Sequence, residues 1–496
     1  MNYKYKILEI VSVLLVLLLN SCQDLDIKYK NLPDMETVYN DPTNVYNVAK
    51  AGFFNYYMIN TSSISPRMSM WVMADQGTCS WGNSGMLDLS SEPRMPFNND
   101  VSYTYANIFE TYWADIYGNI SQVNDVLSVI NEGMEIGDDS KDTEMIRANC
   151  YFIQGLSLGY LGLVYDKAFI MDENVNTEID TITTYPYSEV TQAALASLEK
   201  CIEISEKNDF SIPADWFGGS EYTNTELAQL AHSFSARFMV YMPRNASENS
   251  LTDWQAVYDH ANNGIQRDLA PYMDNVNWIN WFYHYTVRPD WAKIDLRIIN
   301  LMDSSYPYYY PEDGSALPPA SSKDKRLETD FNYVSIINMK PERGYYHFSN
   351  YEYSRYEYNY VLGVNTGEVT EFSAEENMLF KAEALVHLSN LPAAIGIINN
   401  GSRVIRGSLD PVPANATEDQ VLKAIFYERD IELIMTGFGT AFFDMRRRDM
   451  LQTGTLLHLP IPAKELMLLQ KSIYTFGGIG NADGINTSNG GWFPEK

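Results

Sequence analysis

Two glutamates and an arginine form the group in this sequence that most resembles an acid–base catalytic centre. Glu428 and Glu432 lie four positions apart, and Arg429 follows Glu428 directly. On a helix this spacing puts both carboxylates on one face, and a glycosidase works with two carboxylates. Such a trio is more often a structural ion-pair network in which the arginine bridges the acids. We therefore predict no catalytic residue, and a surface glycoside hydrolase is the less favoured alternative.

Metal and nucleotide chemistry have no local motif. The histidines are widely separated, and the chain has no His-x-x-x-His, no Cys-x-x-Cys and no twelve-residue calcium loop. A Gly-Phe-Gly run at 437–439 lacks the third glycine of a dinucleotide fingerprint and follows a helical pattern, so it reads as a helix stop. Walker A and Gly-x-Ser-x-Gly sequences are also missing from the chain. We expect neither a metal ion nor a cofactor.

The N-terminus carries the residue whose chemistry is most sharply predicted. Lys4 and Lys6 precede an apolar run at residues 7–19, which is too short to span a bilayer. The run ends in Leu-Asn-Ser before Cys22, which resembles a bacterial lipoprotein signal. In such proteins the cysteine thiol receives a diacylglycerol, and its amine is acylated after cleavage. We predict a signal peptide at 1–21 and a lipid anchor at Cys22.

Residues 22–40 then read as a polar tether. Asp24 and Asp26 resemble the acidic signal that directs Bacteroidetes lipoproteins to the cell surface, so we expect an outer-membrane, surface-facing location. The alternative is an ordinary secreted protein with Cys22 in a disulfide. The other cysteines, Cys79, Cys150 and Cys201, are too few for a disulfide framework. Cys150 and Cys201 fall in helical patterns and are expected to be small core residues.

Composition describes a large, acidic, aromatic-rich globular protein. The chain has 496 residues, 45% of them hydrophobic, and 64 acids against 35 bases give a net charge of −29. Such a charge repels phosphate backbones, and the longest basic run is only Arg446 to Arg448, so we predict no nucleic-acid binding. The 36 tyrosines, 21 phenylalanines and 9 tryptophans suit either sugar stacking and interfaces or a large core with a tyrosine-rich surface.

Long amphipathic patterns predict a mainly α fold built from antiparallel helix pairs, similar to a tetratricopeptide scaffold. Helices are expected near residues 42–58, 103–130, 142–165, 188–205, 225–241, 252–265, 373–386, 390–405 and 417–437. Capping boxes at 252–255, 373–376 and 417–420 mark three of the helix starts, and Ile405 is expected to face inward on the helix at 390–405. Residues 270–370 lose this periodicity and gain prolines and aromatics, with alternation near 345–360 that indicates short strands. We interpret this long irregular segment as an insertion that displays recognition loops.

Several sequence blocks in the C-terminal third occur in a fixed order. They are ENMLFKAEALV at 376–386, PAAIGIINNGSRVIR at 392–406, YERDIELI at 427–434, FDMRRRDML at 443–451 and HLPIPAKEL at 458–466. These blocks, with a looser match at WADIYGNISQVNDVL, 113–127, resemble the SusD/RagB family, the nutrient-binding surface lipoproteins of Bacteroidetes. The resemblance covers the chain after its signal, most strongly at 370–470. It implies one SusD-like domain at 41–496, with 270–370 as a ligand or interaction insertion.

The resemblance also implies a non-enzymatic function. Proteins of this family capture oligosaccharides, or peptides in some branches, and deliver them to a SusC-like TonB-dependent transporter. They hold the ligand on an aromatic platform that is drawn from a loop before the Trp113 helix and from the irregular insertion. The residues expected at the platform here are Trp81, Asn83, Trp278, Trp281, Tyr283 and Trp291. A packing role is the alternative for each tryptophan.

Overall fold

A computed structural model describes residues 38–78, 82–176, 179–288, 291–336, 348–356, 360–361, 364–481 and 483–488. The chain divides into two compact units, residues 1–41 and 42–496, and the fold described below is that of the second unit. The predicted signal peptide, Cys22 and all but the last three residues of the predicted tether lie outside the described residues. The same holds for Trp81 and Cys79.

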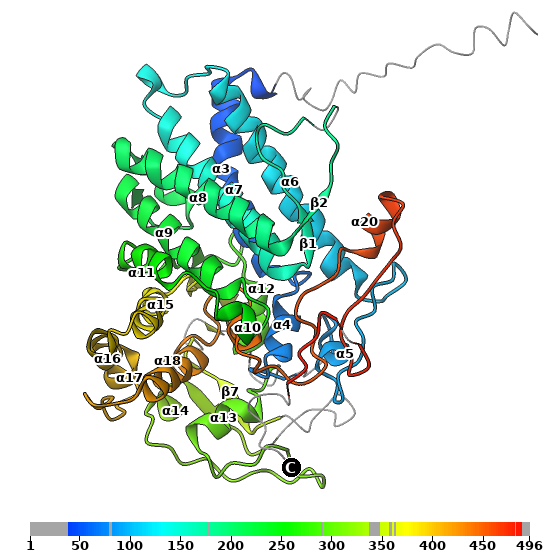
Figure 1. The fold of residues 1–496 in the computed structure, drawn as a ribbon, viewed down its shortest axis with the longest axis vertical. Helices are drawn as coiled ribbons and strands as arrows, with labels where there is room; N and C mark the ends of the chain where they lie inside the picture. Colours follow the sequence, from blue (N-terminus) through cyan, green and yellow to red (C-terminus); the bar gives the residue numbers. More distant parts are fainter. Residues whose placement is uncertain are drawn as a thin grey trace, which may run out of the picture. The chain divides into compact units, whose positions relative to one another are not determined.

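A succession of helices packed against their neighbours forms the body (Figure 1). Along the chain, each of the main helices contacts the next, which is the tetratricopeptide-like arrangement predicted from the sequence. The main helices are α3 (Pro42–Thr61), α6 (Ala106–Asn131), α7 (Thr143–Val164), α8 (Tyr187–Lys207), α9 (Asn224–Tyr241), α11 (Trp254–Asn262), α15 (Ala374–His387), α16 (Leu391–Asn400) and α18 (Glu418–Glu432). The mainly α prediction is therefore confirmed.

Short elements complete the fold. The short helices are α4 (Arg67–Met73), α5 (Met86–Ser90), α10 (Ala246–Asn249), α12 (Trp281–Val287), α13 (Leu296–Met302), α14 (Arg326–Thr329), α17 (Ser402–Ile405), α19 (Thr440–Arg447) and α20 (Ala463–Leu468). The described strands form antiparallel pairs: β1 (Lys167–Phe169) with β2 (Thr184–Pro186), β3 (Ser211–Ile212) with β4 (Tyr222–Thr223), β5 (Tyr272–Met273) with β10 (Gly367–Glu368), β6 (Phe331–Tyr333) with β7 (Tyr351–Tyr353), and β8 (Tyr360–Val361) with β9 (Val364–Asn365). The short strands predicted in the insertion are present.

Helix starts follow the local chemistry of the sequence, with two corrections. Thr417 and Gln420 form the predicted capping box of α18. The cap of α11 is Asp253 rather than Thr252, because the Asp253 carboxylate accepts the Ala256 N–H. Ser373 caps α15 alone, since Glu376, the expected partner in its box, turns inward to an arginine of α9.

The end of α16 differs from the prediction. The helix stops at Asn400, and a separate short helix, α17, follows it. Ile405, expected to face inward on one continuous helix, is 73% exposed, because the break at Gly401 turns the chain. The glycines of the 437–439 run both have positive φ, 70° and 66°, so this run is a helix stop and turn, as predicted.

Buried ion pairs connect the C-terminal helices. Glu383 of α15 accepts hydrogen bonds from Arg429 of α18 and from Arg447 of α19, and Asp444 contacts the same two guanidinium groups. All four side chains are at most 5% exposed. Arg446, also fully buried, donates to the carbonyls of Leu163, Leu457 and Tyr241. Arg446 and Arg447 of the basic run therefore serve the interior of the fold.

Aromatics of the irregular insertion are largely core residues. They pack with aliphatic side chains of α4, α13 and the turn after α18 into one hydrophobic cluster. Its fully or nearly fully buried aromatics include Phe282, Tyr283, Tyr285, Phe331, Phe348, Tyr351 and Tyr353. The interpretation of the whole tyrosine-rich run as display loops is therefore wrong for Tyr351, Tyr353 and Tyr356, which are buried. In this part of the chain the alternative, a large aromatic core, is correct.

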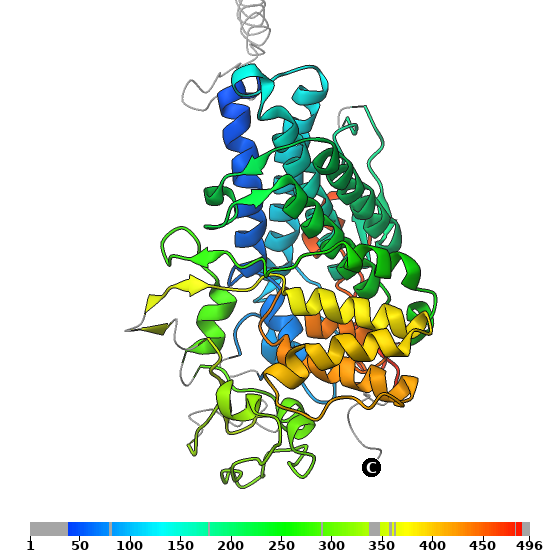
Figure 2. The ribbon, with the colours of Figure 1, turned by 90° about the vertical axis from the view of Figure 1, so that its left-hand side faces the viewer.

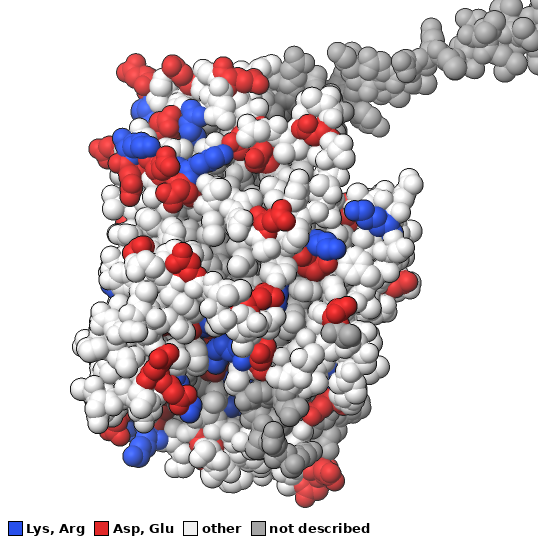
Figure 3. Space-filling view, viewed as in Figure 1, with Lys and Arg blue, Asp and Glu red and all other residues white. Residues whose placement is uncertain are grey.

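The surface charge is predominantly negative. Figure 3 shows acidic groups spread over the visible face, most densely over the upper helices, with few basic groups between them.

Among the described residues, no helix is long and apolar enough to cross a membrane. Cys150 and Cys201 are free and buried, as expected for small core residues.

The first prediction concerns Glu383. Burial would raise the pKa of this carboxyl, but Arg429 and Arg447 outweigh burial and hold the pKa well below its usual range. Removing the charge in Glu383→Gln leaves two buried guanidinium groups short of an acceptor and should lower the free energy of unfolding by about 3–5 kcal/mol. Denaturant unfolding at pH 7 measures this loss. Asp419→Asn, which removes an exposed partner of Lys423, should change the unfolding midpoint little.

The pH dependence of this loss has a defined sign. The same arginines, together with Arg448, lower the pKa of Asp444 to about 2 against the effect of burial. Both depressed carboxyls therefore stabilise the folded state above pH about 4, where they are ionised even when unfolded, and this contribution disappears as the pH falls towards 2. The destabilisation by Glu383→Gln should shrink over that window. A loss that is equally large at pH 3 and pH 7 would contradict this assignment.

Candidate functional site

Helix α12 presents a small set of side chains to solvent because its other side is anchored in the core. Asn280 caps it by accepting the Tyr283 N–H at 2.9 Å. Phe282 points inward and meets Trp71 of α4 edge to face, with ring centroids 5.8 Å apart. Tyr285 is also buried. With these positions fixed inward, Trp281 at the first position of the helix faces out.

Four residues on the outer side form what we call the aromatic face: Trp281, His284, Arg288 and Trp291. The Trp281 and His284 rings lie 5.3 Å apart, and the Arg288 guanidinium lies 4.2 Å from the centre of the Trp291 ring. Trp281 is 45% exposed and Trp291 is 36% exposed. Burial, and then the nearby Arg288 charge, lower the pKa of His284. His284 is therefore neutral at pH 7, and Arg288 carries the charge of this face.

Residues that precede Asn83 in the chain contact the insertion just after Trp291. Gly77 forms a β-bridge with Ile294, and the Thr78 N–H donates to the Lys293 carbonyl at 3.0 Å. A side chain at Gly77 would lie within 2.1 Å of the Trp71 ring, so only glycine permits this approach. Asn83 is exposed. Backbone contacts thus join residues 77–78, which precede Asn83 in the chain, to residues 293–294, which follow Trp291.

Two of the predicted platform residues have other roles. Tyr283 is fully buried, and its hydroxyl donates to the Tyr356 carbonyl, so its ring offers no surface for a ligand and this assignment is wrong. Trp278 is half-buried and meets the Phe54 and Tyr57 rings of α3 at 5.1 and 5.3 Å. For Trp278 the structure shows the packing role that was the alternative.

A groove that was not predicted from the sequence lies next to Trp281. It has a volume of about 470 Å³ and runs between α3 and α6, with Trp281 at its edge. Figure 1 shows α3 and α6 side by side, and Figure 2 shows the green α12 next to the lower part of the blue α3. Its lining residues are Asn55, Met58, Ile59, Ser62, Ala114, Asp115, Gly118, Asn119, Gln122 and Trp281. The polar positions on the outer sides of two helices were its only sequence signal.

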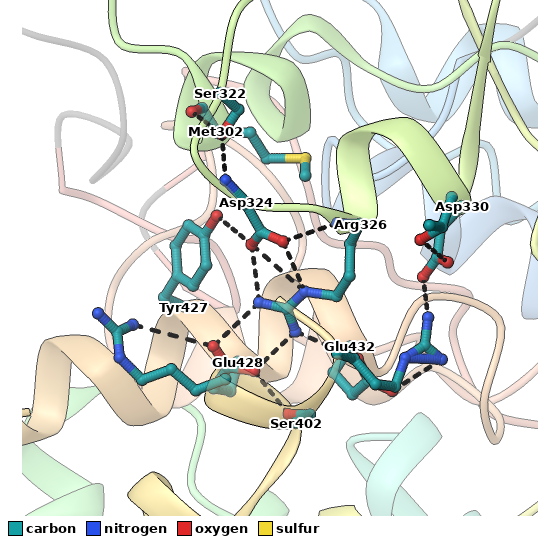
Figure 4. A network of polar contacts seen from close by, with 12 residues as sticks. Met302, Ser322, Asp324, Arg326, Asp330, Ser402, Tyr427, Glu428 and Glu432 are labelled. Atoms are coloured by element: carbon teal, nitrogen blue, oxygen red, sulfur yellow. Dashed lines mark hydrogen bonds and ion pairs between the residues drawn. The ribbon is translucent and has the colours of Figure 1, made fainter. Parts of the chain in front are cut away.

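Glu428 and Glu432 belong to a buried structural network (Figure 4). Both accept hydrogen bonds from Arg326, at 2.7 and 3.1 Å, and Glu428 also accepts from the Ser402 hydroxyl at 2.6 Å. The carboxylates are at most 5% exposed, so a sugar cannot reach them. The structural reading is supported, but the bridging arginine is Arg326 and not Arg429, which turns to Glu383 instead.

No site for a metal ion is found among the described residues, where no group of three or more His, Cys, Asp or Glu side chains could hold one. The nearest approach is a pair, His232 on α9 and His260 on α11, with 2.9 Å between their Nδ1 atoms. Burial, and then the neighbouring His260, lower the pKa of His232 to about 4. The pair is neutral at pH 7 and joins two helices by a hydrogen bond.

The fold of this chain is similar to the folds of several solved structures. No protein-family model matches the chain, and no curated protein does. Among solved structures, a SusD superfamily protein from Parabacteroides distasonis is similar at 12% identity and a TM-score of 0.61, over 86% of this chain and 97% of that one. A SusD-like carbohydrate-binding protein from Bacteroides vulgatus is similar at 16% identity and a TM-score of 0.57, over 82% and 83% of the two chains.

A third similar structure was determined with a xylogluco-oligosaccharide. It is 11% identical to this chain, with a TM-score of 0.53, and the likeness covers 81% of this chain and 82% of that one. Identities this low establish the fold alone. The chain has the SusD-like fold, and the resemblance predicted from its sequence blocks is confirmed at that level.

The second prediction tests the buried carboxylates. Glu428→Gln leaves the Arg326 guanidinium short of a charged partner, so the variant should unfold at a clearly lower denaturant concentration than the unaltered protein. Neither protein should release reducing ends from a polysaccharide. Turnover by the unaltered protein that disappears in Glu428→Gln, with folding preserved, would instead support the hydrolase alternative.

Proposed function

We propose that this protein is a lipid-anchored binding protein of the outer membrane surface that captures oligosaccharides without cleaving them. The observation that carries the proposal is the pair of exposed indoles on the aromatic face, Trp281 and Trp291, within a SusD-like fold. Similar structures include proteins described as carbohydrate-binding, which supports a glycan ligand.

The physical chemistry of the aromatic face suits sugars. A pyranose ring has an apolar C–H face that packs on an indole, and hydroxyl groups around its edge that need directional hydrogen bonds. Trp281 and Trp291 offer apolar faces, and Arg288 offers N–H donors beside the second indole. Asn83 is exposed and offers an amide that can donate to and accept from sugar hydroxyls.

The partner and the location rest on the sequence. The lipoprotein signal that ends at Cys22 supports attachment to the membrane through acyl chains, and Asp24 and Asp26 support export to the surface. A binding protein that does not transform its ligand needs a second protein to take it up. The SusD resemblance supports a SusC-like TonB-dependent transporter for that role.

A peptide is the second candidate ligand. The net charge of −29 would favour cationic peptides over neutral sugars, and an exposed indole also accepts apolar side chains. The two candidates differ in one measurable respect: binding of a cationic peptide should weaken steeply with salt, whereas stacking of a neutral sugar should not.

The third prediction concerns the aromatic face. In the purified full-length protein, Trp281→Ala and Trp291→Ala should each weaken binding of a neutral oligosaccharide at least tenfold, or about 1.4 kcal/mol, because each removes a stacking surface. Isothermal titration with xylogluco-, malto- and manno-oligosaccharides measures this. Ile405→Ala, which truncates an exposed side chain on α17, should bind like the unaltered protein. Binding of peptides alone would contradict the glycan proposal.

The fourth prediction concerns the anchor. Cys22→Ala removes the thiol that would be alkylated, so cells that express it should release the protein from the membrane fraction and should not incorporate labelled palmitate into it. Cys201→Ala, which alters a buried free thiol, serves as the control and should leave both unchanged. Membrane attachment of Cys22→Ala equal to that of the unaltered protein would refute lipid anchoring at this residue.

A further inference from the structure

The groove between α3 and α6 has the composition of a sugar subsite. Met58 and Ile59 give its wall apolar surface, and Trp281 adds an indole at the edge. The rest of the lining is mainly small or amide-bearing. Its volume of about 470 Å³ falls within the range of small-molecule sites.

Two amides in the groove are already oriented by each other. The Asn55 Nδ2 donates to the Gln122 Oε1 at 3.1 Å, across the interface of α3 with α6. Within the described residues this leaves the Asn55 Oδ1 as an acceptor and the Gln122 Nε2 as a donor without protein partners. An acceptor next to a donor matches a sugar hydroxyl, which both donates and accepts.

A third amide lies at the base of the groove. Asn119 is 2% exposed, and its Nδ2 donates to the Gly52 carbonyl of α3 at 3.2 Å. Its Oδ1 is buried and has no hydrogen-bond partner. An unsatisfied buried carbonyl is costly, so a donor that enters from the groove would be bound favourably.

Asp115 is the one charged residue among the groove's described lining residues, and it has no ion-pair partner within the described part of the chain. Partial burial raises the pKa of its carboxyl from the ordinary value, although the side chain remains exposed to solvent. A carboxylate accepts two hydrogen bonds at once, as vicinal sugar hydroxyls can supply. It also repels a second carboxylate or a sulfate.

We propose that this groove is a subsite for a neutral sugar residue and that Asp115 selects against acidic glycans. The sugar ring packs on Trp281, its vicinal hydroxyls donate to Asp115, and Asn55 and Gln122 hold a further hydroxyl. The proposal rests on the proposed function, because it names the class of glycan that the protein captures.

The experiment is a titration of the purified full-length protein with two probes, neutral xylogluco-oligosaccharide and anionic oligogalacturonate. The unaltered protein should bind the neutral probe at least tenfold more tightly. Asp115→Asn keeps a hydrogen-bonding side chain but removes the charge. This variant should therefore bind the anionic probe at least tenfold more tightly than the unaltered protein does. Gln122→Ala should weaken binding of the neutral probe. Asp419→Asn removes the same charge from an exposed site on α18 and is the matched control.

The outcomes separate the two proposals. Tighter binding of the anionic probe by the unaltered protein, or equal behaviour of Asp115→Asn and Asp419→Asn, would overturn the subsite. If Trp291→Ala abolishes binding of the neutral probe while both groove variants bind normally, the glycan function stands and the groove assignment is wrong. If the unaltered protein binds neither these probes nor malto- or manno-oligosaccharides, both proposals fail.

Discussion

Buried arginine–carboxylate pairing is the constraint on which the rest of this structure depends. Arg237 of α9 reaches Glu376 of α15, Arg326 of α14 reaches Glu428 of α18, and Arg429 of α18 reaches back to Glu383 of α15. A guanidinium has five N–H donors in a fixed plane, so each arginine holds several acceptors in a defined geometry. Leaving a buried charge without its partner strongly destabilises the folded state. These ion pairs therefore fix how the helices pack against one another.

The candidate site lies where this rigid scaffold meets the aromatic insertion. Helix α12 is capped by Asn280 and anchored by Phe282, and the anchoring leaves Trp281 exposed next to the surface of α3 and α6. The insertion thus supplies the indoles, and the first helices supply the amides and the carboxylate. A ligand site assembled from both parts needs little rearrangement on binding, because each part is already held by buried contacts.

Sequence reasoning found the helices because their apolar positions repeat with a period near 3.6, and it found the family resemblance from blocks that form the buried network. It could not find which arginine binds Glu428, because Arg326 lies in an irregular segment about a hundred residues away. Tyr283 and Trp281 looked equivalent because this segment has no regular periodicity from which inward and outward positions could be told apart. In the structure Tyr283 is fully buried and Trp281 is 45% exposed. The groove was missed because Asn55 and Gln122 face each other only after α3 and α6 pack together.

The central claim is that a sugar packs on the exposed indole of Trp281. The most direct test is a crystal structure of the full-length protein soaked with xylogluco-oligosaccharide. We expect a sugar ring stacked on Trp281, with a hydroxyl within hydrogen-bond distance of the Asp115 carboxylate. An ordered sugar bound elsewhere on the surface, with the Trp281 indole left open to solvent, would contradict the account.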